Sequence, residues 1–277
     1  MAIQTQLTDG QAVPKAGFSL IEMSIVVVII GLIIGSIAVA KTMIRQAHLQ
    51  SAIGEYGRYV QAIKEFQDRY LALPGDMNNA ENMWGTDPGG CPAAINTVPL
   101  VATCNGDGNG TIGSSDTSGN VSKQTEWYRA WQQLADAGFI NGAFTGTSDA
   151  HGSAVIALSV PESNLRESGW TFFYYLQNAD NPTLWGDHYG HLLSFGQYTS
   201  GDIARTPNLT AAEAFEIDSK IDDGKPGRGI MRARRTAVEP NCTTNDTAQD
   251  AATYNMASSG TRWSGGFACS PIFILGF

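Results

Sequence analysis

Basic side chains are scarce in this sequence. Its 277 residues include 17 Lys and Arg against 26 Asp and Glu, which gives a formal net charge of −9. A protein that binds nucleic acid without sequence preference needs a basic surface, because its cations displace the counterions of the phosphates. The charge therefore argues against such a binder, and we expect no nucleic-acid partner.

Charged residues of either sign are also few. They make up 16% of the chain, against about 25% in an average soluble protein. Hydrophobic residues reach 43%, so the chain is not globally disordered. A surface poor in charge must be built from Ser, Thr, Asn and Gly, which is common on exported proteins.

Sequence signatures of catalysis are missing. The chain has no Gly-x-Ser-x-Gly elbow, no phosphate-binding P-loop and no glycine fingerprint for a dinucleotide. Its one local histidine pair is His188 and His191, in a loop that enters a predicted strand. Side chains three apart in a strand do not share a face. We therefore predict a surface role for this pair rather than a metal site, and no enzymatic activity.

One long apolar run stands near the start of the chain. Residues 18–40 contain 17 apolar side chains among 23, and one charged side chain, Glu22. A membrane-spanning helix needs about 20 apolar residues, whereas the apolar core of a secretory signal peptide has about 7–15. Helical periodicity continues past Ala40, so we interpret the run as retained in the mature protein. A cleaved signal peptide is the alternative.

Glu22 requires a partner inside this run. A carboxylate in hydrocarbon costs at least a few kcal/mol, roughly the value on insertion scales. No Lys or Arg lies between Phe18 and Ala40. The partner must therefore come from another chain, or from an amine that is created at the start of this one.

The residues around this acid resemble a known processing site. The run Gly17-Phe18-Ser19-Leu20-Ile21-Glu22, followed at once by the apolar segment, looks like the cleavage and methylation site of type IV prepilins and pseudopilins. The resemblance covers residues 12 to about 75. It departs from the family at Val39, where many members carry a proline.

The resemblance carries expectations for processing and partners. It implies that a prepilin peptidase cleaves after Gly17 and that Phe18 becomes the methylated N-terminus. It also implies that Glu22 is the assembly acid, which meets the terminal amine of a neighbouring subunit. The expected partners are copies of this chain or other pilins and an inner-membrane assembly platform. The expected location is a single span in the inner membrane before assembly, and afterwards a periplasmic or extracellular filament.

The helix is predicted to continue beyond the membrane. From Ile44 to Tyr70 apolar residues recur every three to five positions, and Pro74-Gly75 ends the pattern. We therefore divide the chain into a cleaved leader (1–17), a membrane or filament-core helix (18–40), its amphipathic continuation (41–74) and a globular head (75–277). The fold class is α+β, with a long helix packed on a mostly antiparallel sheet, which is also the pilin layout.

Within the head, composition and periodicity predict one long loop, two helices and five strands. A Thr210-x-x-Glu213 capping box starts the second helix, which runs to about Ile221. The predicted segments are a loop at 75–122, a helix at 123–137, and strands at 154–160, 169–177, 191–198, 229–234 and 267–275.

Four arginines form a local basic patch in the head. Arg228, Arg232, Arg234 and Arg235 follow shortly after three acids, at 218, 222 and 223. The mixture predicts a salt-bridged surface more than a DNA site. DNA uptake, which some filaments of the resembled family perform, stays an alternative.

The four cysteines follow the predicted span, outside the cytoplasm, where disulfides persist. Three pairings are possible. We favour the pairing that is local in sequence, Cys91 with Cys104 and Cys242 with Cys269. A zinc site is the alternative, although the chain has no Cys-x-x-Cys.

The segment from Asn105 to Asp116 matches the twelve-residue calcium loop of EF-hands. Oxygen side chains occupy loop positions 1, 3 and 5 and a carboxylate closes position 12. No cofactor is required by the sequence, but Ca²⁺ is a candidate. A flexible turn is the alternative. The candidate ligands are Asn105, Asp107, Asn109, Thr111 and Asp116.

Two classes of function remain open at this stage. The first is a structural subunit of a pilus-like or pseudopilus filament, whose head serves adhesion, secretion or another surface interaction. The second is a membrane-anchored extracytoplasmic binding protein or enzyme that uses a pilin-like leader for export. An anchor has no use for an intramembrane acid, so Glu22 favours the first.

Overall fold

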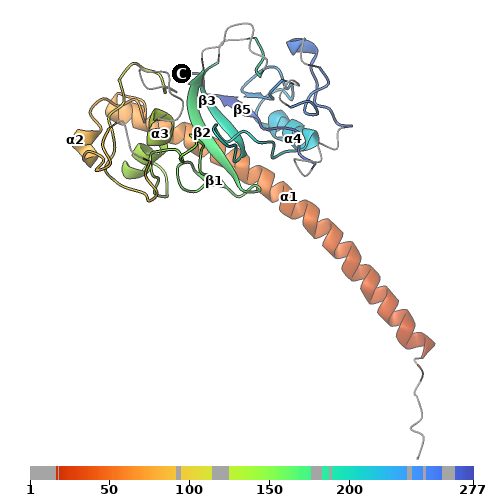
Figure 1. Ribbon diagram of the computed structural model, residues 1–277. Coiled ribbons are helices and arrows are strands. Elements are labelled where there is room, and N and C mark those ends of the chain that lie inside the picture. Colours follow the sequence, from red (N-terminus) through yellow and green to blue (C-terminus); the bar gives the residue numbers. More distant parts are fainter. Residues whose placement is uncertain are drawn as a thin grey trace, which may run out of the picture. The chain divides into compact units, whose positions relative to one another are not determined.

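The computed structural model describes residues 17, 19–91, 95–113, 125–175, 183–186, 189–235, 239–245, 248–257 and 266–277. The chain forms two compact units, residues 1–46 and 47–277, which we describe separately. The first helix, α1 (Leu20–Tyr70), has 51 residues and begins in the first unit (Figure 1).

The first half of α1 has no core of its own. Its apolar side chains from Leu20 to Ile44 are exposed, including Ile21 at 65% and Leu32 at 70%. It is the one helix in the described residues that is long and apolar enough to cross a membrane. Without a protein core to cover them, these side chains require lipid or other subunits.

The second half of α1 packs into the core of the head. Ile53, Tyr56 and Val60 belong to the apolar pattern from Ile44 to Tyr70 but are only partly buried. The buried face combines Leu49, Ile63 and Phe66 of this pattern with other side chains, two of them small alanines. Its fully buried members are Leu49, Ala52, Glu55, Tyr59, Ala62, Ile63 and Phe66.

The helix ends at Tyr70, four residues before the end of the predicted continuation at 41–74. Leu71 has a left-handed backbone, with φ 54°, and Pro74 disfavours a helical conformation in the residue before it. The chain therefore turns away from the helix axis immediately after Tyr70.

The head is built on a five-stranded sheet in the order β1-β2-β3-β5-β4, and all neighbouring strands are antiparallel. Its centre is a long ladder in which Ser168 pairs with Gln197 and Tyr175 with Gly190. The strands are β1 (Glu162–Ser163), β2 (Ser168–Tyr175), β3 (Gly190–Gln197), β4 (Met231–Arg232) and β5 (Ile272–Ile274).

Helices surround this sheet, and with α1 it gives the α+β, pilin-like architecture predicted from sequence. In Figure 1, α2 and α3 lie near the end of α1, and α4 contacts β4 at the edge of the sheet. Trp131 of α3 and Trp170 of β2 are fully buried and both contact Tyr59 of α1. The remaining elements are α2 (Glu81–Trp84), α3 (Thr125–Asp136), α4 (Ala211–Ile221) and the short 3-10 helix η2 (Gln249–Ala251).

Local signals predicted some head elements well and others poorly. The capping box at Thr210 and Glu213 forms with both of its hydrogen bonds and starts α4. The predicted strand at 154–160 is wrong. Ala157 has φ 66° and the Ser159 hydroxyl bonds the backbone of Val155, so this segment is a turn.

The last two predicted strands are too long. Only Met231–Arg232 of the segment 229–234 and only Ile272–Ile274 of the segment 267–275 join the sheet. Before β5 the chain pairs instead with the segment that leads into α4, through hydrogen bonds between Leu209 and Cys269.

Candidate functional site

Glu22 lies in the first turn of α1. Its Oε2 accepts a hydrogen bond of 2.8 Å from the backbone N–H of Ser19, where the helix dipole favours a negative charge. Glu22 and Gly17 are exposed, while Phe18 and the leader residues 1–16 lie outside the described residues. In the isolated chain the acid therefore caps its own helix and is open to a partner from outside.

A group of three carboxylates lies in the head. Asp76, Asp107 and Glu126 each place one oxygen within 4.8 Å of the others. They come from the segment after α1, the predicted calcium loop and the first turn of α3. We call this group the Asp76 cluster.

Loop amides hold the Asp76 cluster together. Asp76 accepts hydrogen bonds from the amides of Asn109 and Gly110, at 3.0 and 2.9 Å. Glu126 accepts from the amides of Asp107 and Gly113. None of the hydrogen bonds that the described residues make to these three carboxylates comes from a Lys or Arg side chain.

Burial makes this concentration of negative charge costly. It raises the pKa of Glu126 to about 7, with smaller raising effects from the charges of Asp107 and Asp76 and lowering effects from the two amides. Burial is also the largest cause that raises the pKa of Asp76. At neutral pH the Asp76 cluster therefore favours either a bound proton or a bound cation.

The structure differs from the calcium loop predicted from sequence. The side chain of Asn105 accepts a hydrogen bond from the amide of Glu81 and so caps α2. The side-chain oxygen Oδ1 of Asn109 accepts hydrogen bonds from the backbone N–H and from the hydroxyl of Thr111. Asp116 lies outside the described residues. Of the five predicted ligands, the structure places Asp107 in the cluster.

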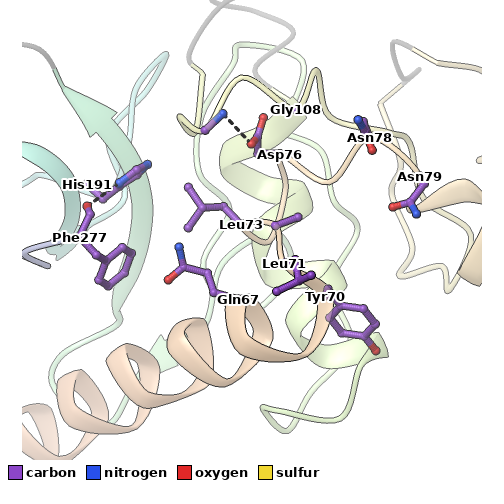
Figure 2. A pocket seen from close by; sticks show the side chains of 12 residues that line it. Gln67, Tyr70, Leu71, Leu73, Asp76, Asn78, Asn79, Gly108, His191 and Phe277 are labelled. Atoms are coloured by element: carbon purple, nitrogen blue, oxygen red, sulfur yellow. Dashed lines mark hydrogen bonds between the residues drawn. The ribbon is translucent and has the colours of Figure 1, made fainter.

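A cavity of about 500 Å³ opens beside the cluster. Asp76 and Gly108 line one side of it, and His191 and Phe277 line the other (Figure 2). Asp107 itself is exposed. The Asp76 cluster can thus be reached from solvent without unfolding of the head.

His191 is buried on β3, and its Nδ1 lies 3.0 Å from the backbone oxygen of Phe277. The prediction of a surface role is therefore wrong for this histidine. Its ring points into the aromatic core beside Phe172 and Tyr174. His188 lies outside the described residues.

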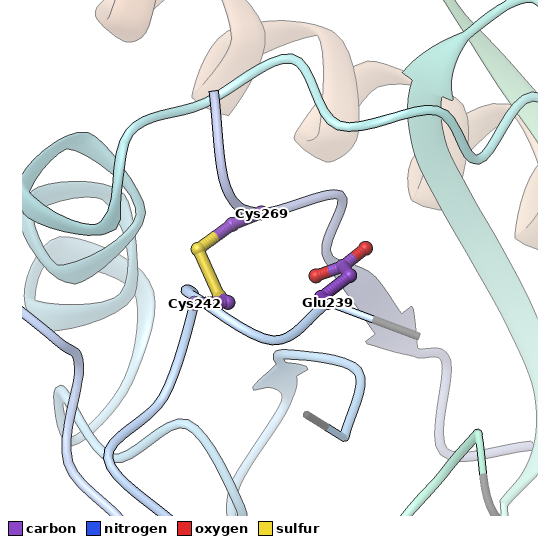
Figure 3. A group of neighbouring side chains, drawn as sticks. All are labelled: Glu239, Cys242 and Cys269. Atoms are coloured by element: carbon purple, nitrogen blue, oxygen red, sulfur yellow. A yellow bond between two sulfur atoms is a disulfide. The ribbon is translucent and has the colours of Figure 1, made fainter. Parts of the chain in front are cut away.

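Both disulfides of the structure are local in sequence, Cys91–Cys104 and Cys242–Cys269. The carboxyl group of Glu239 lies beside the second disulfide (Figure 3). A cysteine binds zinc as a thiolate, and all four sulfur atoms are in disulfide bonds. The zinc alternative is therefore not supported.

The four arginines of the basic patch do not act together. Arg228 pairs with Asp250, and Arg234 is buried, where it bonds Ser194. Arg232 is also buried, over the ring of Tyr189. The predicted ion pairs with the acids at 218–223 are absent from the described residues.

The sequence reasoning missed Glu55, which is 2% exposed on α1. Its Oε2 accepts a hydrogen bond of 2.9 Å from the indole N–H of Trp170, and Ser51 donates to Oε1. A signal existed, because Glu55 lies three residues after Ala52 and four before Tyr59 on the buried face. Glu55 therefore ties α1 to the sheet.

Comparison with known families identifies one feature of the chain. Residues 14–38 match the model of the prokaryotic N-terminal methylation motif. The chain thus carries the hallmark of type IV pilin-like prepilin leaders. The comparisons with curated proteins and with solved structures give no match.

Proposed function

We propose that this protein is a structural subunit of a type IV pilus-like or pseudopilus filament. The observation that carries the proposal is the leader motif at residues 14–38 joined to the exposed apolar half of α1. Such a surface is unstable in water. A bilayer before assembly and a bundle of like helices after assembly would both cover it.

The assembly route follows from the leader. A prepilin peptidase cleaves between Gly17 and Phe18, and the new amine of Phe18 is methylated. The processed chain then remains anchored in the inner membrane by a single span until it enters the filament through an assembly platform. There the Phe18 amine of one subunit neutralises Glu22 of its neighbour, since no base within the span can do so.

The head serves as the exposed coat of the filament, in adhesion, secretion or another surface interaction, and not as an enzyme. This is consistent with the positions of the candidate polar groups: His191 and Glu239 are buried, and the cysteines are in disulfides. The alternative is an anchored binding protein or enzyme that uses the leader for export alone.

Glu22→Ala separates the two functions. We expect the variant to enter the membrane as well as the wild type, because a costly charge has left the span. We expect shear-released filaments to fall at least several-fold, because the Phe18 amine loses its partner. The readouts are membrane fractionation, an antibody against the head, and intact-mass spectrometry for a mature chain of 260 residues (277 − 17).

Glu65→Ala is the matched control, because Glu65 is an exposed acid on the same helix. Its hydrogen-bond partner Gln61 is also exposed. The control should assemble normally. Normal filament yield from Glu22→Ala, or a mature chain that keeps residues 1–17, would favour the anchored alternative.

We also propose that the Asp76 cluster binds Ca²⁺ in the filament subunit. The donor set fits, because three carboxylates offer the hard oxygen ligands that Ca²⁺ takes. Asp76, Asp107 and Glu126 would hold the ion, and its charge would remove their mutual repulsion. This ligand set replaces Asn105, Asn109, Thr111 and Asp116 of the sequence prediction.

The test is thermal unfolding of the full chain in detergent, in millimolar Ca²⁺ and in chelator. A ligand that binds only the folded state raises the melting temperature, and Asp107→Ala should reduce the rise by the share that the Asp76 cluster contributes. Asp68→Ala, at an exposed acid on α1, is the control and should keep it. If the loop is only a turn and binds no ion, Ca²⁺ should change the melting temperatures of Asp107→Ala and Asp68→Ala by the same amount.

A further inference from the structure

A second group of carboxylates lies at the end of α4, the helix labelled in Figure 1. Asp218 belongs to the last turns of this helix, and Asp222 and Asp223 follow it directly. Each places one carboxylate oxygen within 4.8 Å of the others. We call this group the Asp218 cluster.

Asp218 is fully buried, on the face of α4 that also buries Ala214 and Ile217. Its Oδ2 accepts a hydrogen bond of 2.8 Å from the hydroxyl of Tyr254. Its Oδ1 is buried and accepts no hydrogen bond from any described residue. A buried acceptor without a partner costs about 1–3 kcal/mol, and more when it is charged. The buried Oδ1 is therefore open to a cation or a proton.

The neighbouring acids are held by the loop that follows. Asp222 accepts a hydrogen bond from the amide of Ile230, and Asp223 accepts one of 2.9 Å from the amide of Lys225. Gly229 has φ 79° and lies so close to the Asp222 carboxylate that a side chain there would collide with it. The loop is therefore closed around these carboxylates.

In the described part of the head, two basic side chains near this group bond other acids. Lys220 bonds Glu216, and Arg228 pairs with Asp250. Among the described residues, no ion pair joins Asp218, Asp222 or Asp223 to a Lys or Arg. Three carboxylates thus converge on one another with only neutral donors around them.

We propose that Asp218, Asp222 and Asp223 bind a calcium ion. Ca²⁺ takes oxygen ligands at about 2.3–2.6 Å, so two ligands of one ion lie up to about 5 Å apart, which is compatible with the limit of 4.8 Å between the oxygens of this cluster. Mg²⁺ demands a tighter octahedral arrangement at about 2.0–2.1 Å. Mg²⁺ also keeps several waters and is usually held by only one or two carboxylates, so a group of three carboxylates favours Ca²⁺.

The electrostatics of Asp218 agree with a bound cation. Burial raises its pKa to about 7, the hydrogen bond from Tyr254 lowers it, and the charges of Asp223 and Asp222 raise it. The amide of Gly224 is close enough to lower the pKa as well, although it makes no hydrogen bond to Oδ1. A proton on Oδ1 is the competitor that the experiment must distinguish.

The ion would add a link between three segments. These are the end of α4, the loop at 222–230 and, through Tyr254, the segment between Cys242 and Cys269. The Asp218 cluster and the Asp76 cluster share no residue. The two sites can therefore be removed one at a time.

The experiment counts bound Ca²⁺ per chain by equilibrium dialysis with radioactive Ca²⁺, on the full chain in detergent. Four proteins are compared: wild type, Asp218→Asn, Asp107→Ala and the double variant. Asn is isosteric with a protonated Asp. The variant Asp218→Asn therefore keeps the fold if a proton on Asp218, without a bound ion, is enough for the head to fold. We expect Asp218→Asn to bind one ion fewer in both backgrounds, or to bind it at least tenfold more weakly.

Asp223→Asn, at an exposed position, gives the same expected loss if Asp218→Asn fails to fold. Asp250→Asn is the control and should keep the wild-type stoichiometry, because Asp250 is exposed and pairs with Arg228. Unchanged calcium binding in both Asp218→Asn and Asp223→Asn would overturn the proposal and assign Oδ1 to a proton. None of these results depends on filament assembly. Failure of the calcium proposal can therefore be distinguished from failure of the proposed function.

Discussion

Replacement of Glu55 tests how α1 is joined to the head. The carboxylate is buried and accepts hydrogen bonds from three donors that lie on different segments. The indole N–H of Trp170 donates at 2.9 Å, the Ser51 hydroxyl at 3.0 Å and the amide of Asn164 at 3.4 Å. Glu55→Ala removes all three acceptor contacts at once.

The expected loss of stability depends on which of these donors remain buried, out of reach of water, after Glu55 is replaced. Trp170 is 0% exposed, so its N–H would be left buried and unsatisfied, at a cost of about 1–3 kcal/mol. Ser51 is only half-buried and Asn164 is exposed, so water can replace their bonds. We expect Glu55→Ala to lower the free energy of unfolding of the head by about 2–3 kcal/mol. Glu55→Gln keeps one acceptor oxygen and should cost about 1 kcal/mol.

Urea unfolding followed by tryptophan fluorescence measures these differences, because Trp170 is a reporter at the contact itself. Glu65→Ala, on the exposed face of the same helix, should change the free energy of unfolding by less than about 0.5 kcal/mol. If Glu55→Ala unfolds like this control, or if Gln costs as much as Ala, the hydrogen bonds to Glu55 do not hold the helix in place.

Two further predictions concern the disulfides and the response to pH. Chain entropy predicts losses of about 3 kcal/mol when Cys91–Cys104 is replaced by serines and about 3.5 kcal/mol for Cys242–Cys269, because the closed loops span 13 and 27 residues. Urea unfolding of the two double variants tests the order, and a larger loss at Cys91–Cys104 would contradict it. Burial raises the pKa of Asp136 to about 7, and the charge of Arg129 lowers it less. The folded state thus holds a proton that the unfolded state releases above about pH 4, and wild type loses stability as pH rises from 5 to 8. Asp136→Asn lacks this loss, so its stability relative to wild type should grow over that range; a constant difference would show that Asp136 is already ionised at pH 5.

Neighbouring residues by themselves determined the parts of this protein that depend on local signals. The apolar run at 18–40, the leader motif and the capping box of Thr210 and Glu213 are each contained in a short segment. The strands β2 and β3 begin within one residue of the predicted positions. Hydrophobic periodicity and capping act over a few residues, so the sequence alone can reveal them.

Tertiary packing decided the remainder. The Asp76 cluster combines residues 76, 107 and 126, and Glu55 meets Trp170 across 115 positions. The segment at 154–160 has the composition of a strand but folds as a turn, because Ala157 takes a left-handed conformation and Ser159 bonds back to Val155. Contacts of this kind depend on how the whole head packs. A carboxylate does not become a ligand or an anchor by its type alone, but by what burial and long-range neighbours place around it.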